Sequence, residues 1–174
     1  MISKAKKQWY AVYTRARSEK RVAAELAEAG VEVYLPLLKT LRQWSDRKKK
    51  VEEPLIRSYI FVRIKGKTYY DVLNTQGVVK FVKFNEKPAP IPDWQIKNLK
   101  ILLNSGESFD EEHNKFYPGD LVKINKGSLK GLKGIITEVK GKSKLVIKLD
   151  VININFTVNI HSVFVEPVSL SEIL

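Results

Sequence analysis

The sequence predicts an α+β protein in two parts: an α/β sandwich with a mainly antiparallel sheet over residues 1–104, and a small β-barrel over residues 115–174. Strand-like and helix-like runs are mixed through the first part, whereas short β-runs separated by glycines fill the second. Between the two parts, residues 105–114 are polar, acidic and without periodicity, which is typical of a linker. We therefore expect two domains, with the boundary near residue 110.

Four strands and three helices are expected in the first part. Val22 and Leu26 stand at helical spacing, and Gly30 is expected to end that helix. Residues 40–53 are highly charged and are expected to form a mobile hairpin. An extended spacer is expected at Pro88-Ala-Pro-Ile-Pro92, because each proline disfavours helix in the residue before it. The expected strands span residues 8–13, 31–38, 55–64 and 78–84, and the expected helices span residues 17–29, 68–74 and 93–103.

The second part is organised around residues 116–139, where two β-runs are joined by a loop with glycines at positions 127, 131 and 134. Glycine allows the positive φ or the close backbone approach that β-branched residues do not. Two further β-runs, over residues 144–149 and 151–158, follow at the short spacing of an all-β barrel. The pattern indicates a small barrel that binds macromolecules, unless the glycines only shape turns.

Composition limits the class of protein. A chain of 174 residues with 44% apolar residues is long enough for one large domain or two small ones, each with a core. It contains no run of 18 apolar residues, and its N-terminus lacks the apolar segment of a signal peptide, so we expect no membrane passage and a cytoplasmic location. The absence of cysteine excludes disulfides, thiolate metal sites and cysteine nucleophiles.

The net charge of +12 is unevenly distributed. Residues 1–104 contain 22 Lys and Arg against 10 Asp and Glu, whereas the remaining residues contain 9 of each kind. A positive field of this kind attracts polyanions, so nucleic acid is the expected partner of the first part. The alternative is a basic surface that serves only solubility.

The sequence offers no support for catalysis. His113 and His161 are isolated, which argues against a metal site or a catalytic triad. Adjacent carboxylates at positions 52 and 53 face opposite ways in a strand, a poor arrangement for paired acid and base catalysis. Gly141-Lys-Ser143 has the end of a phosphate-binding loop, but Ile136 stands where its first glycine is required. We expect no enzyme activity, cofactor or metal.

Six blocks follow one another along the first part: Trp9-Tyr-Ala-Val-Tyr13, Glu19-Lys-Arg21, Glu32-Val-Tyr-Leu-Pro36, Glu53-Pro-Leu-Ile-Arg-Ser-Tyr-Ile-Phe-Val62, Gly77-Val-Val-Lys-Phe-Val82 and Pro88-Ala-Pro-Ile-Pro92. In order and spacing they resemble the N-terminal domain of the NusG family, and residues 116–139 resemble a KOW motif on an SH3-like barrel. The resemblance covers nearly the whole chain. It implies a transcription elongation factor whose N-terminal (NGN-like) domain binds the clamp helices of RNA polymerase and whose KOW domain recruits other factors.

One block departs from the pattern of the general factor, which has Pro-Gly-Tyr where this chain has Arg57, Ser58 and Tyr59. The form found here resembles the specialised paralogues of the UpxY and RfaH type, which regulate particular long operons, often for capsule or other surface polysaccharide. Arg57 replaces a proline that is common even among those paralogues. The alternatives are a general housekeeping factor of the same family and a ribosomal or RNA-binding KOW protein.

The resemblance implies a polymerase-binding surface, an apolar depression to which Tyr13, Ile56, Tyr59, Phe61, Phe84 and Ile96 correspond. Strand residues of alternating parity cannot all face outward, so about half of the six are expected to pack in the core. On the family pattern, Ile56 and Tyr59 are the expected exposed pair. For Thr68, Tyr69 and Tyr70 the resemblance implies a contact with the gate loop of the polymerase. The alternative is that these residues only pack against the domain.

The residues implied to meet nucleic acid, either the non-template DNA strand or nascent RNA, lie at the start of the first expected helix. Arginine offers planar bidentate contacts to phosphate or guanine, whereas lysine supplies a point charge. The basic run at residues 47–50 would add a salt-sensitive contribution, although such a run is commonly a solvated tip. The four residues are Arg15, Arg17, Lys20 and Arg21.

In the barrel, Ile152, Ile154 and Phe156 lie near the surface implied to bind a ribosomal protein or a termination factor. Their alternation with asparagine makes one apolar face, for which the barrel core is the favoured destination. The β-branched residues of 151–158 favour a barrel over the helical hairpin of some specialised relatives, so no fold switch is expected. A monomer fits the family.

Overall fold

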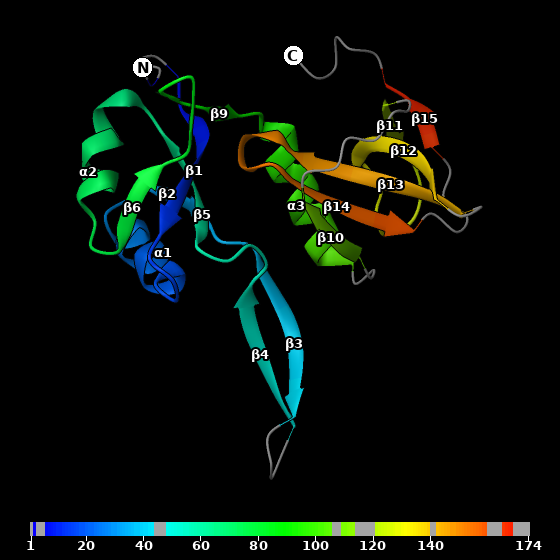
Figure 1. Ribbon diagram of the computed structural model, residues 1–174, viewed down its shortest axis with the longest axis horizontal. Coiled ribbons are helices and arrows are strands. Elements are labelled where there is room, and N and C mark those ends of the chain that lie inside the picture. Colours follow the sequence, from blue (N-terminus) through cyan, green and yellow to red (C-terminus); the bar gives the residue numbers. More distant parts are fainter. Residues whose placement is uncertain are drawn as a thin grey trace. The chain divides into compact units, whose positions relative to one another are not determined.

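The computed structural model describes residues 2, 6–43, 48–105, 109–113, 121–139, 142–159 and 165–168. The chain divides into two compact units, Met1–Ile91 and Pro92–Leu174. The expected α+β class is confirmed, since the first unit combines helices with an antiparallel sheet and the second is rich in strands (Figure 1). The division falls earlier than the boundary expected near residue 110.

The sheet of the first unit has the strand order β2-β5-β1-β6, and β9 pairs with β1 beyond the end of β6. All its pairings are antiparallel, and the register of the two central strands sets Tyr13 opposite Tyr59. The expected first strand is confirmed to within one residue. The strands are β1 (Gln8–Thr14), β2 (Glu32–Tyr34), β5 (Tyr59–Ile64), β6 (Val78–Phe81) and β9 (Pro90–Ile91).

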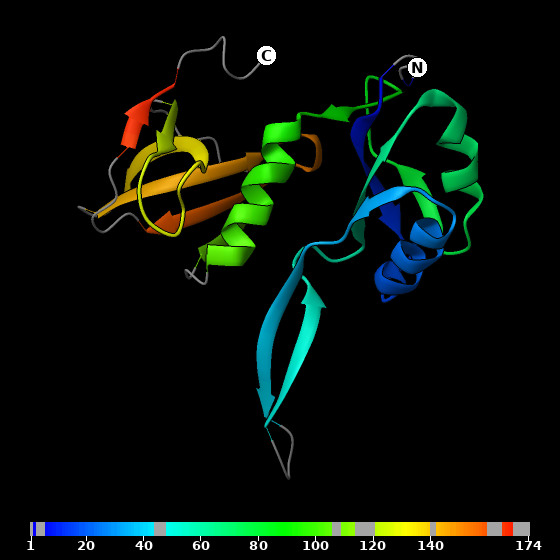
Figure 2. The ribbon, with the colours of Figure 1, turned by 180° about the vertical axis from the view of Figure 1, so that it is seen from behind.

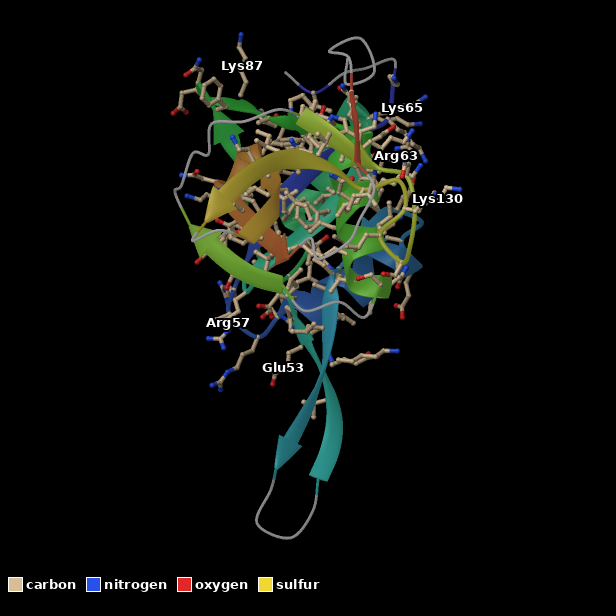
Figure 3. The ribbon with its side chains drawn as sticks, turned by 90° about the vertical axis from the view of Figure 1, so that its right-hand side faces the viewer. Glu53, Arg57, Arg63, Lys65, Lys87 and Lys130 are labelled. Atoms are coloured by element: carbon tan, nitrogen blue, oxygen red, sulfur yellow. The ribbon has the colours of Figure 1, made fainter. Side chains whose placement is uncertain are left out.

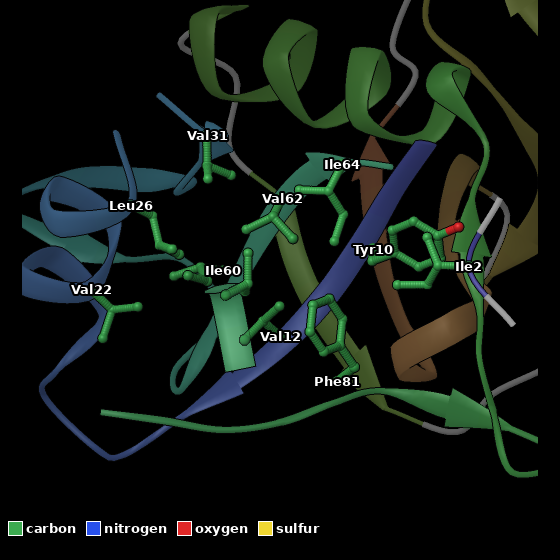
Figure 4. Close-up of a cluster of buried hydrophobic side chains, with 11 residues drawn as sticks. Ile2, Tyr10, Val12, Val22, Leu26, Val31, Ile60, Val62, Ile64 and Phe81 are labelled. Carbon is green, nitrogen blue, oxygen red and sulfur yellow. The ribbon is translucent and has the colours of Figure 1, made fainter. Parts of the chain in front are cut away.

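Helices α1 (Glu19–Glu28) and α2 (Tyr69–Asn74) pack on the same face of this sheet. Alternate residues of β1 and β5 meet Val22 and Leu26 of α1 and Val72 of α2 in one buried cluster (Figure 4). Each fully buried aliphatic side chain stabilises the fold by about 1.5–3 kcal/mol relative to exposure. The strand residues of the cluster include Tyr10, Val12, Ile60, Val62, Ile64 and Phe81.

Gly77 allows the chain to pass close to α1 before β6 begins. Its φ is +99°, and a Cβ atom placed there would lie 3.0 Å from Cγ2 of Val22 and 3.1 Å from Nη2 of Arg21. A larger residue would therefore be strained in its backbone and would also press on the helix. Gly77 thus lets β6, an edge strand of the sheet, begin close to the core-facing side of α1.

Two of the expected strands are each divided in the structure. The one expected over residues 31–38 becomes β2 and β3 (Leu37–Gln43), with Pro36 between them, because proline has no N–H to donate to a ladder. Its partner β4 (Lys48–Pro54) completes the expected hairpin, which extends away from the sheet in both views of the molecule (Figures 1 and 2). The one expected over residues 78–84 ends at Phe81, and Val82 then donates its N–H to the carbonyl of Ala11.

A second, short hairpin follows, formed by β7 (Lys83–Phe84) and β8 (Lys87–Pro88). Its turn residues, Asn85 and Glu86, have φ values of 48° and 60°, a left-handed pair typical of two-residue hairpin turns. The proline-rich spacer expected at residues 88–92 is therefore extended but not free, since it contributes to both β8 and β9.

The second unit contains α3 (Asp93–Ser105) and a sheet with the strand order β10-β14-β13-β12-β11-β15. Part of the segment expected to be a linker forms β10, which pairs with β14 over five residues. This pairing is made by the backbone, so the acidic sequence gave no periodicity by which to predict it. The strands are β10 (Phe109–His113), β11 (Leu121–Ile124), β12 (Lys133–Val139), β13 (Lys142–Leu149), β14 (Ile154–Asn159) and β15 (Val165–Pro167).

Helix α3 is attached to the barrel by a side chain. Asn98 of α3, 1% exposed, donates from Nδ2 to the carbonyl of Lys133 and accepts the Lys133 N–H at Oδ1 over 3.1 Å. The asparagine thus occupies both backbone groups of one strand residue, as a neighbouring strand would. Leu99 and Leu102, on the same helix, are buried as well.

Candidate functional site

The sheet of the first unit presents two different faces, because side chains alternate along each strand. One face carries the buried hydrophobic cluster under α1 and α2. On the other, Tyr13 of β1 and Tyr59 of β5 stand opposite each other with ring centroids 5.3 Å apart and planes at 70°. Tyr34 of β2 stacks on Phe61 with centroids 6.3 Å apart and planes at 28°. We call these four residues the aromatic face.

Two phenols of this face, those of Tyr34 and Tyr59, are held in their neutral form by burial. Burial, and to a lesser extent the neighbouring Tyr13, raises the pKa of Tyr59, and burial raises the pKa of Tyr34. Removing a phenol from water disfavours its charged form. Tyr34 and Tyr59 therefore offer apolar rings and neutral hydroxyl groups rather than charge.

The six residues implied to bind polymerase differ in exposure. Phe84, on the β7–β8 hairpin, is 73% exposed, and Tyr13 and Tyr59 are partly exposed. Phe61 is fully buried, and Ile96, on α3 in the second unit, is 2% exposed. Three of the six residues, Phe84, Tyr13 and Tyr59, are therefore accessible.

The expectation that Ile56 is exposed was wrong, because only 2% of it is accessible. The strand expected from residue 55 begins at Tyr59, and the residues before it form a bend and turn in which Ser58 has a φ of 62°. Strand parity therefore does not apply to Ile56. Tyr59, the other member of the expected pair, is partly exposed.

The turn before β5 is held by a carboxylate that the sequence analysis did not single out. Glu19, the first residue of α1, is 5% exposed, and its Oε1 accepts the Ser58 N–H over 2.7 Å. Ser58 in turn accepts the Thr14 N–H at its carbonyl over 2.8 Å. These bonds fix the unusual conformation of Ser58 beside Tyr59. An acidic residue in the first helical turn was the available signal, although it is equally typical of a helix start.

The four basic residues expected to meet nucleic acid fall into two pairs. Arg15 and Arg17 are exposed. Lys20 and Arg21 are exposed too, but Lys20 donates to the carbonyl of Glu52 over 2.7 Å and Arg21 donates to Oε1 of Gln76 over 3.2 Å. The first pair is thus the more available to a ligand.

Arg57 adds to this basic region. With Arg17 and Lys20 it lines a cleft of about 560 Å³, whose walls also include Glu19 and Glu53. Arg57 and Glu53 lie near the base of the β3–β4 hairpin (Figure 3). The basic run expected to add charge at residues 47–50 falls partly on β4, and residue 47 lies outside the described residues.

The tyrosines implied to touch the gate loop are placed differently from each other. Tyr69 stacks on Phe81, with centroids 4.6 Å apart and planes at 28°, so it packs against the core. Tyr70 meets Tyr69 edge-on at 5.1 Å and is 68% exposed. Thr68 ends the short 3₁₀ turn η1 (Gly66–Thr68) and is partly exposed. Tyr70 is therefore the accessible residue of the three.

In the barrel, Ile154 and Phe156 are 5% and 0% exposed, so both pack in the core of the second unit. Ile152, in the 3₁₀ turn η2 (Asp150–Ile152), is partly exposed. It precedes Asn153, whose φ is 55°. Of the three residues implied to bind a partner, only Ile152 has accessible surface.

No group of three or more His, Asp or Glu residues among the described residues is placed to hold a metal ion. Nor is any helix within the described ranges long and apolar enough to cross a membrane. What the first unit does present is exposed or partly exposed aromatic side chains and exposed arginines, residue types that serve in binding to macromolecules. The fold and site thus define a two-unit binding protein.

Comparison with known proteins identifies its family. The sequence model described as "Transcription termination factor nusG" matches residues 7–100, more than half of the chain. The chain belongs to the NusG family and is a NusG-type transcription termination/antitermination factor. Factors of this family act with RNA polymerase in transcription, and the relatives found are transcription factors rather than known enzymes.

The similarity to individual relatives is low but extends over most of the chain. It is 24% identical to NusG of Rickettsia felis over 158 residues, covering 83% of this chain and 82% of the relative. It is 24% identical to NusG of Escherichia coli O6:H1 over 164 residues, covering 87% and 91%. A solved structure of Thermotoga maritima NusG is 24% identical, with a TM-score of 0.48, and covers 94% of this chain and 98% of that chain.

Proposed function

We propose that this protein binds the clamp helices of RNA polymerase through its first unit and suppresses pausing and termination. The observation that carries the proposal is the exposure of Phe84 at 73%, together with the partly exposed pair of Tyr13 and Tyr59. Covering an exposed aromatic side chain with a partner removes apolar surface from water and so contributes to affinity. Helix-in-groove contacts draw their affinity from a few such anchors.

The proposed role of nucleic acid is to strengthen and position this complex. Arg15 and Arg17 are the preferred contacts to the non-template DNA strand or nascent RNA, because Lys20 and Arg21 already donate to groups of this chain. Arg57, at the cleft that Arg17 also lines, can add a bidentate contact to phosphate. This contribution weakens with salt, since it depends on the release of counterions.

The proposed mechanism involves binding without covalent chemistry. A factor that binds the elongating state of polymerase more tightly than the paused state shifts the population toward elongation. Tyr70, 68% exposed on α2, would add a contact to the gate loop across the main cleft. The two contacts together would hold the polymerase clamp closed around DNA.

The proposed targets are particular long operons, such as those for capsule or other surface polysaccharide. Support comes from the segment before β5, where Ser58 adopts a left-handed backbone and Arg57 is exposed at the basic cleft. The alternative is a general housekeeping role. Transcript sequencing after deletion of the gene separates the two, since a specialised factor alters a few long operons and a general factor alters transcription throughout the genome.

The second unit is proposed to recruit a further factor, a ribosomal protein or a termination factor. Ile152 is the candidate contact, because Ile154 and Phe156 are buried. We infer that the protein works as a monomer in the cytoplasm, where bacterial transcription takes place. Titration of each purified candidate partner against the wild type and Ile152→Asp tests this surface.

Polymerase docking is tested by single-round transcription on a template with pause and terminator sites. Wild type should lengthen the transcripts, and Phe84→Asp should abolish the effect because it places a charge where an apolar contact forms. Val79→Asp is the matched control, since Val79 is also apolar and 47% exposed but lies outside the proposed surface. Ile56→Asp would test folding rather than docking, because Ile56 is buried.

Equal readthrough by the wild type and Phe84→Asp would contradict docking through this surface. If Val79→Asp lost as much readthrough as Phe84→Asp, the loss would follow from placing a charge at any exposed apolar position and not from removing a contact of Phe84.

A further inference from the structure

A cavity beside helix α2 has no part in the contacts proposed above for the clamp helices and the basic cleft. It has a volume of about 720 Å³ and is lined by Gly66, Lys67, Tyr69, Tyr70, Lys83 and Lys87, among others. All of these residues belong to the first compact unit. Its volume lies within the range of about 300–1,000 Å³ that is common for small-ligand sites.

Two tyrosine rings line this cavity: Tyr69 is packed in place, and Tyr70 is accessible to solvent. Tyr69 is fixed by its stacking on Phe81 at 4.6 Å. Tyr70 meets it edge-on, with planes at 81°, and is 68% exposed. A ring that is held at one edge and open to solvent can receive another planar group by stacking.

The cavity is also positively charged. Three lysines, Lys67, Lys83 and Lys87, line it together with a single carboxylate, Glu86. Within the described part of the chain, none of the three ammonium groups forms an ion pair. They come from two separate segments, since Lys67 belongs to η1 and the other two to the β7–β8 hairpin.

We propose that this cavity binds an unpaired nucleotide of a single-stranded nucleic acid, with the base against Tyr70 and the flanking phosphates at the lysines. Aromatic stacking platforms combined with positive charge are the usual means of holding single strands. A nucleotide inside a strand has a phosphate on each side, which suits lysines from two segments. A free mononucleotide has its phosphate at one end only. The site is distinct from Arg15 and Arg17.

This proposal does not depend on the docking of polymerase. The gate-loop contact proposed above would compete for Tyr70, but it makes no use of Lys83 or Lys87. Binding of a strand to the protein alone can therefore be measured whether or not polymerase docks through Phe84.

The first test is fluorescence anisotropy of a labelled oligothymidylate with the full chain at several salt concentrations. Tyr70→Ala should weaken binding about 5- to 150-fold, the range expected for loss of one stacked base, whereas Tyr70→Phe should bind as the wild type does. Lys83→Glu should weaken binding and reduce its salt dependence. Lys80→Glu is the matched control, since Lys80 is exposed but does not line the cavity, and it should have the smaller effect.

The second test maps the contact with an oligonucleotide that contains 4-thiothymidine, crosslinked by light and located by mass spectrometry. Crosslinks within residues 67–87 would support the proposal. Crosslinks confined to residues 15–21, wild-type affinity in Tyr70→Ala, or thymidine monophosphate binding as tightly as the oligonucleotide would each overturn it. Since Tyr70 is exposed, its substitution tests the contact rather than the fold.

Discussion

The two faces of the first unit's sheet are made by the same strands and differ in what packs against them. Beneath α1 and α2, Val12, Ile60 and Val62 are fully buried and pack with Phe81. On the other face, Tyr13 and Tyr59 pair as rings and keep part of their surface accessible. The difference shows that alternation along a strand places residues that stabilise the fold on one face and aromatic residues with accessible surface on the other. Substitutions on each side should affect different measurements.

The largest effect is expected on the covered face. Phe81→Ala should lower the free energy of unfolding by about 3–5 kcal/mol, because Phe81 is 1% exposed and contacts both Tyr10 and Tyr69. Urea unfolding measures the change. Phe84→Ala removes the same side chain where it is 73% exposed, and should change stability by no more than about 0.5 kcal/mol. Equal losses would contradict the assignment of Phe84 to an exposed surface.

A smaller loss is expected where the chain passes α1. Gly77→Ala should cost about 2 kcal/mol, since the residue has a positive φ and its Cβ would meet Val22 at 3.0 Å. Gly30→Ala is the control, because Gly30 has a φ of +78° but no atom within 4 Å of a Cβ, so only the backbone term of about 1 kcal/mol applies. Thermal unfolding should rank the two variants in this order, and the reverse order would argue against close packing at Gly77.

A gain in stability is expected beside the aromatic face. Ser58→Gly should stabilise the protein by about 0.5–1 kcal/mol, because glycine adopts a φ of 62° without the steric cost that serine carries. The N–H bond to Glu19 is kept in this variant. Ser58→Ala retains the side-chain β-carbon and should show no such gain in a denaturant titration.

The smallest effect concerns pH. The native pKa of Tyr59 is raised above its ordinary value of 10.0, so the native state holds the proton more tightly than the unfolded state. The stabilisation is complete below about pH 10 and is lost as the pH rises through the native pKa. Tyr59→Phe should therefore flatten the fall in the urea midpoint as the pH rises above about 10. An unchanged slope would mean that Tyr59 does not titrate differently in the two states.

Much of the fold could be predicted from periodicity. The first strand and the three helices follow local patterns of apolar residues, and their positions agree with the prediction to within a few residues. Strand β10 could not be predicted in this way, because its acidic residues carry no alternation and its pairing depends on the edge of β14. Pro36 could have indicated the break between β2 and β3, since it removes a backbone donor.

The candidate site was less predictable than the fold. Residue type alone does not distinguish buried Ile56 from exposed Phe84, because the turn at Ser58 decides where Ile56 points. The hydrogen bond between Glu19 and Ser58 joins residues 39 positions apart, which no local pattern reveals. Lys83 and Lys87 come to line one cavity with Tyr70 only through the folding of the β7–β8 hairpin.

The attachment of α3 has a practical consequence for anyone who divides this chain. A fragment that ends at residue 104 would carry Asn98 away from both backbone groups of Lys133 and would separate α3 from the rest of its compact unit. Such a fragment should self-associate or precipitate. A cut after Ile91 keeps β9 on β1 and leaves the asparagine with its strand, so the useful place to separate the halves lies inside the region that sequence similarity assigns to one domain.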